Sequence, residues 1–256
     1  MWLLSVLLLS YLAKPNLSIT LDYCARSLCG RRQHIACNNL GAWSSACPRS
    51  PSEPLAINFN EVHRNQILLG HNVRRNQIAG GNLNGYRSAR RMATMRWDNE
   101  LAQLALLNVR QCEMRHDACR NTDTFRASGQ NLAIYGYSGA RSRRTIAQLI
   151  NISLEMWWNE YRDANMNIIN RYPSNHSGPQ IGHFTAMAQA SNTHCGCAAA
   201  VFIRNSMNWF LLACNYATTN WVGQPVYQVG NPTSGCLRGR NNNFRSLCNV
   251  SERFNV

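Results

Sequence analysis

The sequence Ile181-Gly182-His183-Phe184-Thr185 places a histidine between a glycine and an aromatic residue, at the entrance to the most strand-like part of the chain. Three upstream segments each contribute one polar side chain that can converge on this histidine, namely His71, Gln130 and Glu160. We therefore predict that the fold brings these four residues together in one cleft, which is the candidate site of the protein.

Strands are predicted after this stretch and helices before it. The apolar runs expected to be strands are 184–189, 197–203 and 208–216, and the last two form a hairpin around 204–207. The continuous apolar character of the hairpin predicts burial on both faces. Helical patterns cover 56–79, a segment that starts at Trp97-Asp98, and 145–162, with loops at 82–96, 120–144 and 163–181. This order predicts an α+β layered domain.

Two acidic residues stand at predicted helix ends. Asp98 is placed to cap the N-terminus of the second helix. Glu160 falls in the last turn of the third helix, where a carboxylate opposes the helix dipole. An acid in this unfavourable position indicates a specific partner elsewhere in the fold.

Composition indicates a globular protein with a basic surface. The chain has 256 residues, of which 45% are hydrophobic and 15% charged. The net charge is +14, and Lys14 is the only lysine. Arginine clusters at 87–91 and 141–144 favour anionic partners such as sulfated glycans, although a solvated basic surface without a dedicated partner is the simpler interpretation. No nucleic-acid motif accompanies the clusters, so no nucleic-acid partner is expected.

The N-terminus predicts export. Residues 1–20 read as a signal peptide, because Trp2–Leu12 is an apolar run too short to span a bilayer, and the best cleavage position follows Thr20. We expect a secreted, extracellular monomer without a transmembrane segment. Sequons at Asn151, Asn175 and Asn249 are predicted glycosylation sites.

Eleven cysteines agree with export, where they are expected to form disulfides. Paired C-x-x-C knuckles for zinc are missing from the sequence. Residues 21–54 form a cysteine-rich extension, and Cys112 and Cys119 lie on or near the second helix, which suggests that the extension is pinned onto it. Residues 223–256 form a tail in which Cys236 and Cys248 close a loop. Because the number of cysteines is odd, one thiol is unpaired.

Five short motifs occur in an order that is typical of one family. They are His71-Asn72 with Arg74-Arg75, Trp97-Asp98-Asn99-Glu100-Leu101, Gly129-Gln130-Asn131-Leu132, Gly182-His183-Phe184-Thr185 and Cys214-Asn215-Tyr216. Over residues 21–230 the chain resembles the secreted CAP proteins, the superfamily of cysteine-rich secretory, antigen-5 and pathogenesis-related proteins. Within it the chain is most similar to the insect antigen-5-like, venom-allergen-related branch.

The resemblance implies a disulfide-rich three-layer α-β-α sandwich, with the CAP domain over 55–222. It also implies a free thiol at Cys195 and the following disulfides: Cys24–Cys37, Cys29–Cys119, Cys47–Cys112 and Cys197–Cys214, with Cys236–Cys248 as an addition in the tail. The chain departs from the family pattern at two places. Ala188-Gln189 replaces an apolar residue and a tryptophan, and Gln130 replaces a glutamate.

The resemblance assigns the cleft tetrad to His71, Gln130, Glu160 and His183. His71 and His183 can bind a divalent metal, with zinc as the usual candidate in the family, but hydrolytic zinc sites use three protein ligands. Gln130 is a poor zinc ligand and cannot act as a base, and no nucleophile stands in a recognisable motif.

Three functions therefore remain open, beside a purely structural role for the histidines. We favour a non-enzymatic binding or effector protein for a lipid, a sterol, another small amphipathic ligand or an extracellular partner, with no cofactor required. The alternatives are a metal-dependent hydrolase that uses His71, His183 and Glu160, and an arginine-rich binder of anionic glycans.

Overall fold

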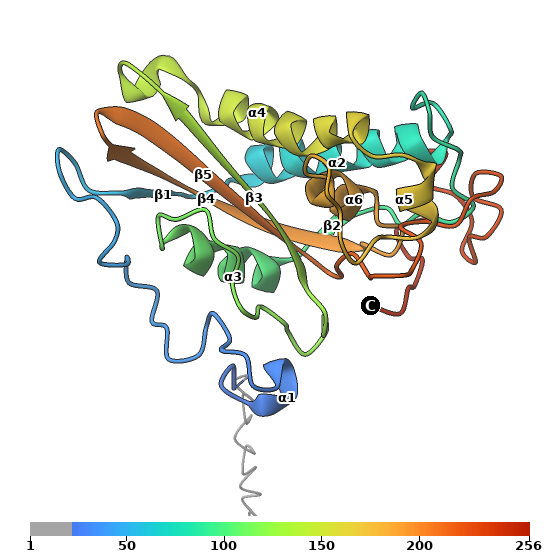
Figure 1. Cartoon of the computed structure of the whole chain (residues 1–256), viewed down its shortest axis with the longest axis horizontal. Helices are drawn as coiled ribbons and strands as arrows, with labels where there is room; N and C mark the ends of the chain where they lie inside the picture. The colour runs from blue at the N-terminus through green and yellow to red at the C-terminus, as the bar shows by residue number, and fades with distance from the viewer. Residues whose placement is uncertain (1–21) are drawn as a thin grey trace, which may run out of the picture.

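The computed structural model describes residues 22–256, so the predicted signal peptide lies outside the described range. One sheet runs through the middle of the molecule (Figure 1). Its strands lie in the order β1 (Leu55–Ile57), β4 (His194–Arg204), β5 (Met207–Tyr216) and β3 (Gly129–Tyr137), all antiparallel to their neighbours. The two-residue strand β2 (Arg96–Trp97) pairs with β4 in parallel.

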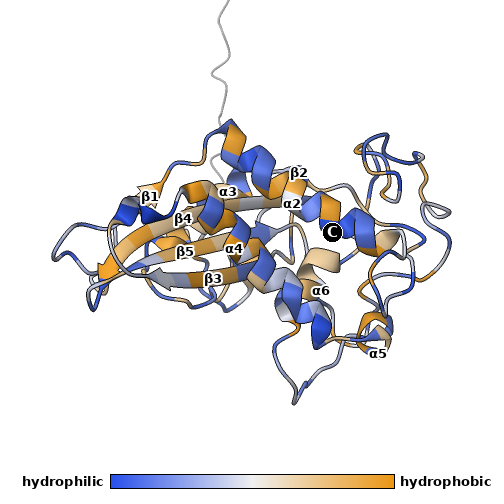
Figure 2. Cartoon of the chain, turned by 90° about the horizontal axis from the view of Figure 1, so that it is seen from above, coloured by the Kyte–Doolittle hydropathy of each residue, from blue (hydrophilic) through white to orange (hydrophobic). Residues whose placement is uncertain are grey.

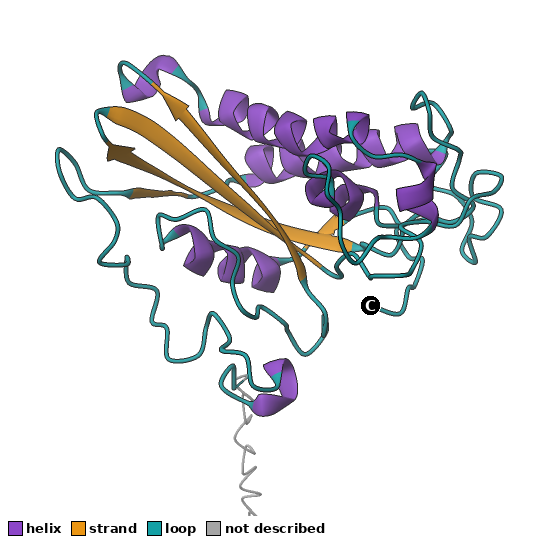
Figure 3. Cartoon of the chain, in the orientation of Figure 1, coloured by secondary structure: helices purple, strands orange, loops and turns teal. Residues whose placement is uncertain are grey.

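Helices cover both faces of this sheet (Figures 1 and 3). On one face lie α2 (Glu61–Ala79), α4 (Ile146–Asn159) and α6 (Gly182–Ala188), and on the other lies α3 (Asn99–Val109). The remaining helical turns are α1 (Arg26–Cys29), α5 (Met166–Asn170) and the 3₁₀ turns Arg141–Arg143 and Glu160–Arg162. The predicted three-layer α-β-α sandwich is confirmed.

The hairpin β4–β5 is buried on both faces, as its apolar sequence predicts. Ala199 and Val201 of β4 pack into the core under α2, α4 and α6, whereas Ala200 and Phe202 pack into the core under α3. This alternation follows from the two-residue period of a strand. Figure 2 shows the resulting hydrophobic colour along β4 and β5.

Helix α3 lies unusually close to the sheet. Asp98 caps it as predicted, since its Oδ1 accepts a hydrogen bond of 2.8 Å from the Leu101 N–H. Gly196 of β4 lies directly under its first turn, and a Cβ atom at that position would stand 2.2 Å from the Ala102 nitrogen. Glycine is therefore required at 196 for this contact.

Three of the predicted segments are wrong, and one predicted helix begins later than expected. The segment predicted as a loop over 163–181 contains the short helix α5, Met166–Asn170. Residues 184–189 do not form a strand, because α6 covers Gly182–Ala188 and is held by capping groups from other elements. The segment predicted as a loop over 120–144 contains β3, and its polar strand residues find partners in the folded chain. The first long helix begins at Glu61 rather than at 56, since residues 55–57 pair with β4 as β1.

The cysteines pair in the structure as the resemblance implies. The disulfides are Cys24–Cys37, Cys29–Cys119, Cys47–Cys112, Cys197–Cys214 and Cys236–Cys248. Cys195 is free and buried. The extension is thus attached to the segment that follows α3, because Cys112 lies just beyond the end of that helix.

A fully buried arginine joins α2 to the end of α6. All five N–H groups of the Arg75 guanidinium donate to backbone carbonyls, two to Ala93 and one each to Met187, Gln189 and Ala190, over 2.7–3.2 Å. Burial lowers the pKa of Arg75 to about 9, so the group remains charged at neutral pH. The cation lies where the α6 dipole is negative.

We expect Arg75→Met to lower the free energy of unfolding by more than about 3 kcal/mol, because it leaves several buried carbonyls without donors. Urea unfolding at pH 7 measures this loss. The neighbouring Arg74→Met is the control, with a loss below about 1 kcal/mol, since Arg74 meets only the Gly70 carbonyl and the exposed Glu155. Equal losses in the two variants would contradict the proposed role of Arg75.

Candidate functional site

Glu160 caps the N-terminus of α6. Its Oε2 accepts hydrogen bonds from the His183 N–H at 2.8 Å and the Phe184 N–H at 3.1 Å. Its Oε1 lies 2.5 Å from His183 Nδ1. The sequence predicts a specific partner for Glu160, and that partner is the N-terminus of α6. An acidic side chain is favourable there because the helix dipole is positive at that end.

His183 is held from several directions. Its imidazole lies against the Trp157 ring, with 6.1 Å between the ring centroids. Its carbonyl accepts from Asn131 Nδ2 of β3 at 3.1 Å. The side chain of His183 is 8% exposed and that of Glu160 is 12% exposed, so the pair is largely shielded from water.

Gln130 joins a separate polar cluster on the same strand, β3. Its Nε2 donates to Asp117 Oδ2 at 2.7 Å and to Asn215 Oδ1 at 2.9 Å, and its Oε1 lies 2.9 Å from His116 Nδ1. A glutamate at this position would turn a carboxylate toward Asp117. The amide is thus the group that this buried cluster requires.

The second histidine of this polar cluster is His116, which none of the sequence motifs contains. Partial burial lowers its pKa, and the nearby Arg120 and His183 also lower it. The residue as a whole is exposed, while its Nδ1 lies in a partly buried contact with Gln130. One feature of the sequence could have indicated His116: it lies three residues before Cys119, and the disulfide of Cys119 with Cys29 fixes the segment that holds it.

The prediction that His71 belongs to the cleft is wrong. His71 is fully buried, its Nδ1–H donates to the Ile67 carbonyl at 2.8 Å, and its Nε2 lies 2.8 Å from the Tyr216 hydroxyl. Both ring nitrogens are therefore occupied inside the core, where the ring ties α2 to β5. Burial lowers the pKa of His71 to about 4, with smaller contributions from Arg75 and Arg74.

These residues do not fit a hydrolytic zinc site. Within residues 22–256, no group of three or more His, Cys, Asp or Glu side chains is arranged to hold a metal ion. His71 is committed to the core, and the Nδ1 atom of His183 is committed to Glu160. Among the described residues of this polar cluster, His183 and His116 are the histidines left, and two imidazoles are fewer than the three protein ligands of such sites.

The free thiol and the sequons lie outside this cluster. Cys195 is fully buried, and burial raises the pKa of its thiol to about 12, which makes it a poor nucleophile. Asn175 is exposed in a loop, Asn151 is exposed on α4, and Asn249 is partly exposed. Across the part of the chain that is described, no helix combines the length and apolar character needed to cross a membrane.

The fold, the disulfides and this polar cluster together define a class of protein. The family described as the cysteine-rich secretory protein family, CAP, matches residues 81–216. The chain belongs to the CAP family.

Its relatives place it with the insect venom allergens. It is 38% identical over 232 residues to Venom allergen-1 of Aedes aegypti, covering 91% of this chain and 89% of the relative. It is 31% identical to Venom allergen 5.02 of Dolichovespula maculata, covering 81% and 94%. A crystal structure of NaASP2 with Zn2+ shares the fold, with a TM-score of 0.60 and 22% identity over 79% of this chain and 99% of that one.

We expect Gln130→Glu to lower the free energy of unfolding at pH 7 by about 1–3 kcal/mol, because two hydrogen-bond donors are replaced by a charge that faces Asp117. The loss relative to wild type should shrink at pH 5, where a proton can be shared between the two carboxylates. Urea unfolding at both pH values measures it. The exposed Gln103→Glu serves as the control and should change stability by less than about 0.5 kcal/mol. If Gln130→Glu leaves the free energy of unfolding at pH 7 unchanged, the amide is not required.

The lowered pKa of His71 predicts loss of stability in acid. The unfolded chain, with a histidine pKa near 6.5, binds a proton that folded His71 accepts only near pH 4. The stabilising contribution of neutral His71 is therefore fully present above pH 6.5 and is lost as the pH falls toward 4. The contribution of His71 between pH 7 and pH 5 is about 2 kcal/mol.

His71→Gln removes this titration and should show a correspondingly smaller fall in unfolding free energy between these pH values. The exposed His176→Gln is the control and should keep the wild-type fall. An unchanged fall in His71→Gln would mean that other groups, such as His34 and His194, account for the acid sensitivity.

Proposed function

We propose that the chain is a secreted, extracellular binding or effector protein of the CAP family and that it is not an enzyme. The observation that carries this proposal is that Glu160 and Gln130 are already engaged in hydrogen bonds within the fold. Both oxygens of Glu160 are occupied by the start of α6, and the Gln130 amide is occupied by Asp117 and Asn215. Neither group is free to move a proton for a substrate.

Two further observations support a role without catalysis. The one free thiol among the described residues is buried, with a raised pKa. The acid next to His183 caps a helix through its other oxygen, which differs from the acid of a catalytic triad. Export is supported by the five disulfides and by the relatives that are named venom allergens.

A metal-dependent hydrolase is the second candidate, and one observation favours it. The structural neighbour NaASP2 is described with Zn2+. In this chain His183 and His116 could supply two ligands, but a third is lacking among the described residues. A weakly held ion could bind there without producing the hydroxide that hydrolysis needs.

We expect no turnover of a mixed peptide library by the purified full-length secreted protein, with Zn²⁺ or with a chelator, above the level of its His183→Ala variant. Mass spectrometry of the library measures cleavage. The exposed His176→Ala is the matched control for purification and folding. Metal-dependent cleavage that His176→Ala retains and His183→Ala loses would overturn the proposal and establish the hydrolase.

A further inference from the structure

The arginine cluster at 141–144 lies in the connection between β3 and α4, at one end of the molecule (Figure 1). Its sequence is Arg141-Ser142-Arg143-Arg144, and Thr145 follows it. In the whole sequence this is the one stretch of four residues with arginine at the first, third and fourth positions. Neither the sheet nor the cluster around His183 uses these arginines, so another role has to explain them.

This connection is open to solvent. Residues 138–145 are exposed apart from Arg141, which is partly exposed. The segment is held by single hydrogen bonds, such as that from the Arg143 N–H to the Ala140 carbonyl at 2.9 Å and that from Arg141 Nη2 to Ser52 Oγ at 3.0 Å. A surface segment held in this way can open locally while the core stays folded, and such segments are preferred sites of proteolysis.

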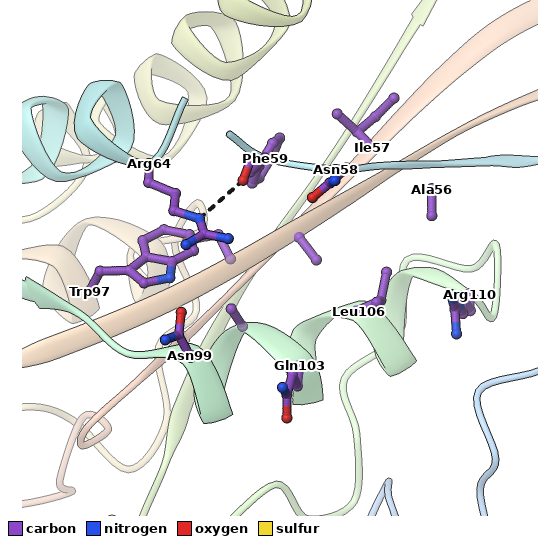
Figure 4. Close-up of a pocket in the computed structure, with 13 residues that line it drawn as sticks. Ala56, Ile57, Asn58, Phe59, Arg64, Trp97, Asn99, Gln103, Leu106 and Arg110 are labelled. Atoms are coloured by element: carbon purple, nitrogen blue, oxygen red, sulfur yellow. Dashed lines mark hydrogen bonds between the residues drawn. The ribbon is translucent and has the colours of Figure 1, made fainter. Parts of the chain in front are cut away.

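The arginines of this cluster differ from those that the fold uses. Arg64, for example, donates to the Phe59 carbonyl at 3.0 Å in the pocket beside α3 (Figure 4). No ion pair within residues 22–256 includes Arg143 or Arg144. Their exposed guanidinium groups are therefore available to the carboxylates of a partner.

The bond between Arg144 and Thr145 already has the backbone form in which an endoprotease binds its substrate. Arg144 has φ −124° and ψ 128°, and Thr145 has φ −74° and ψ 155°, both in the extended region. Side chains of an extended peptide alternate, so once the 3₁₀ turn is extended Arg141 and Arg143 face one side and Arg144 faces the other. Acidic subsites at these positions would recognise all three guanidinium groups.

A second stretch, 87–90, has the sequence Arg-Ser-Ala-Arg but is not accessible in the same way. Ala89 is fully buried, and its N–H donates to the Ala79 carbonyl at 3.1 Å. The Arg90 carbonyl, which would be the one attacked, accepts from the Gly235 N–H at 2.8 Å. Burial and backbone pairing therefore protect this stretch, whereas the stretch at 141–144 has neither protection.

We propose that the bond between Arg144 and Thr145 is a processing site for a subtilisin-like serine endoprotease of the secretory pathway that recognises arginine at the first, second and fourth residues before the cut. The oxygen of a water molecule bonds to the Arg144 carbonyl carbon, and the C–N bond breaks. Both water protons end on the Thr145 nitrogen, which leaves a carboxylate and an ammonium. The inference rests on the export that the proposed function includes and is independent of what the protein binds.

The two products of this cut should stay assembled. Strand β3 lies before the cut and pairs with β5 after it along all of Gly129–Tyr137, while α2 and α4 pack together on one face of the sheet. The new Thr145 ammonium lies at the N-terminus of α4, where the helix dipole is positive, so it destabilises the first turn. Because α4 also holds Trp157 against His183, processing acts on the helix that supports the polar cluster.

Digestion of the purified full-length secreted protein tests the proposal. The probe is a purified, calcium-dependent subtilisin-like processing protease of this specificity, and uncut protein comes from cells treated with a peptidyl inhibitor of this protease class. Folded wild type should give two chains on a reducing gel, and N-terminal sequencing of the second should begin at Thr145. The two chains should elute together in size-exclusion chromatography. A synthetic peptide of residues 137–149 is the positive control for the protease.

Two variants separate the recognition of spacing from the effect of charge. Arg144→Gln should slow cleavage at least about hundredfold, because the guanidinium next to the cut is lost. The double variant Arg141→Ser with Ser142→Arg keeps the net charge but moves one arginine out of position, and it should slow cleavage at least about tenfold. Its retention on heparin should equal that of wild type. Arg171→Gln, at another exposed arginine, is the matched control and should be cut like wild type.

Several results would overturn the processing site. It is excluded if folded wild type stays intact while the peptide is cut, if the double variant is cut as fast as wild type, or if the cut follows Arg90. An intact wild type whose heparin retention falls in Arg144→Gln would assign the cluster to an anionic glycan instead. Retention of the chain inside cells would contradict the proposed export, whereas digestion of protein purified from those cells would still decide whether the protease recognises the site.

Discussion

The seven-residue helix α6 depends on two charges that come from other elements. Glu160 accepts from its first N–H groups and Arg75 donates to carbonyls at its end, so each charge meets the end of the helix dipole that attracts it. So short a helix has little stability of its own in water. The position of His183, and with it the shape of the cleft, therefore depends on this pair of caps.

The same arrangement limits the chemistry available to the cleft. A carboxylate that holds two backbone N–H groups and an imidazole is not free to act as a base, and an amide shared by Asp117 and Asn215 holds the strand β3 in place. These hydrogen bonds join the start of α6 to Glu160 and join β3 to β5 and the segment at Asp117.

Features set by neighbouring residues could be predicted from the sequence, whereas features set by distant ones could not. The Asp98 cap and the hairpin depend on local pattern, and both are present in the structure. The apolar run of α6 resembles a strand because the caps that make it a helix come from far along the chain. Motif order suggests that His71 lies in the cleft but does not reveal helical phase, and it is the buried face of α2 that turns this ring toward Tyr216. His116 has no apolar pattern around it to mark it.

The disulfides form two separate groups along the described chain. Three link residues within 24–119 and two link residues within 197–248, and none of the five crosses between these ranges. A single cut in the exposed loop around Asn175 would therefore yield two fragments that are held together by non-covalent contacts alone, namely the sheet, the shared hydrophobic core and side-chain contacts such as Arg91–Glu252. A cut between α2 and β2 would leave one covalent molecule, because Cys47–Cys112 spans it. The covalent effect of one cut therefore depends on its position: a cut within 120–196 severs the described chain, whereas a cut within 29–119 leaves it joined by a disulfide.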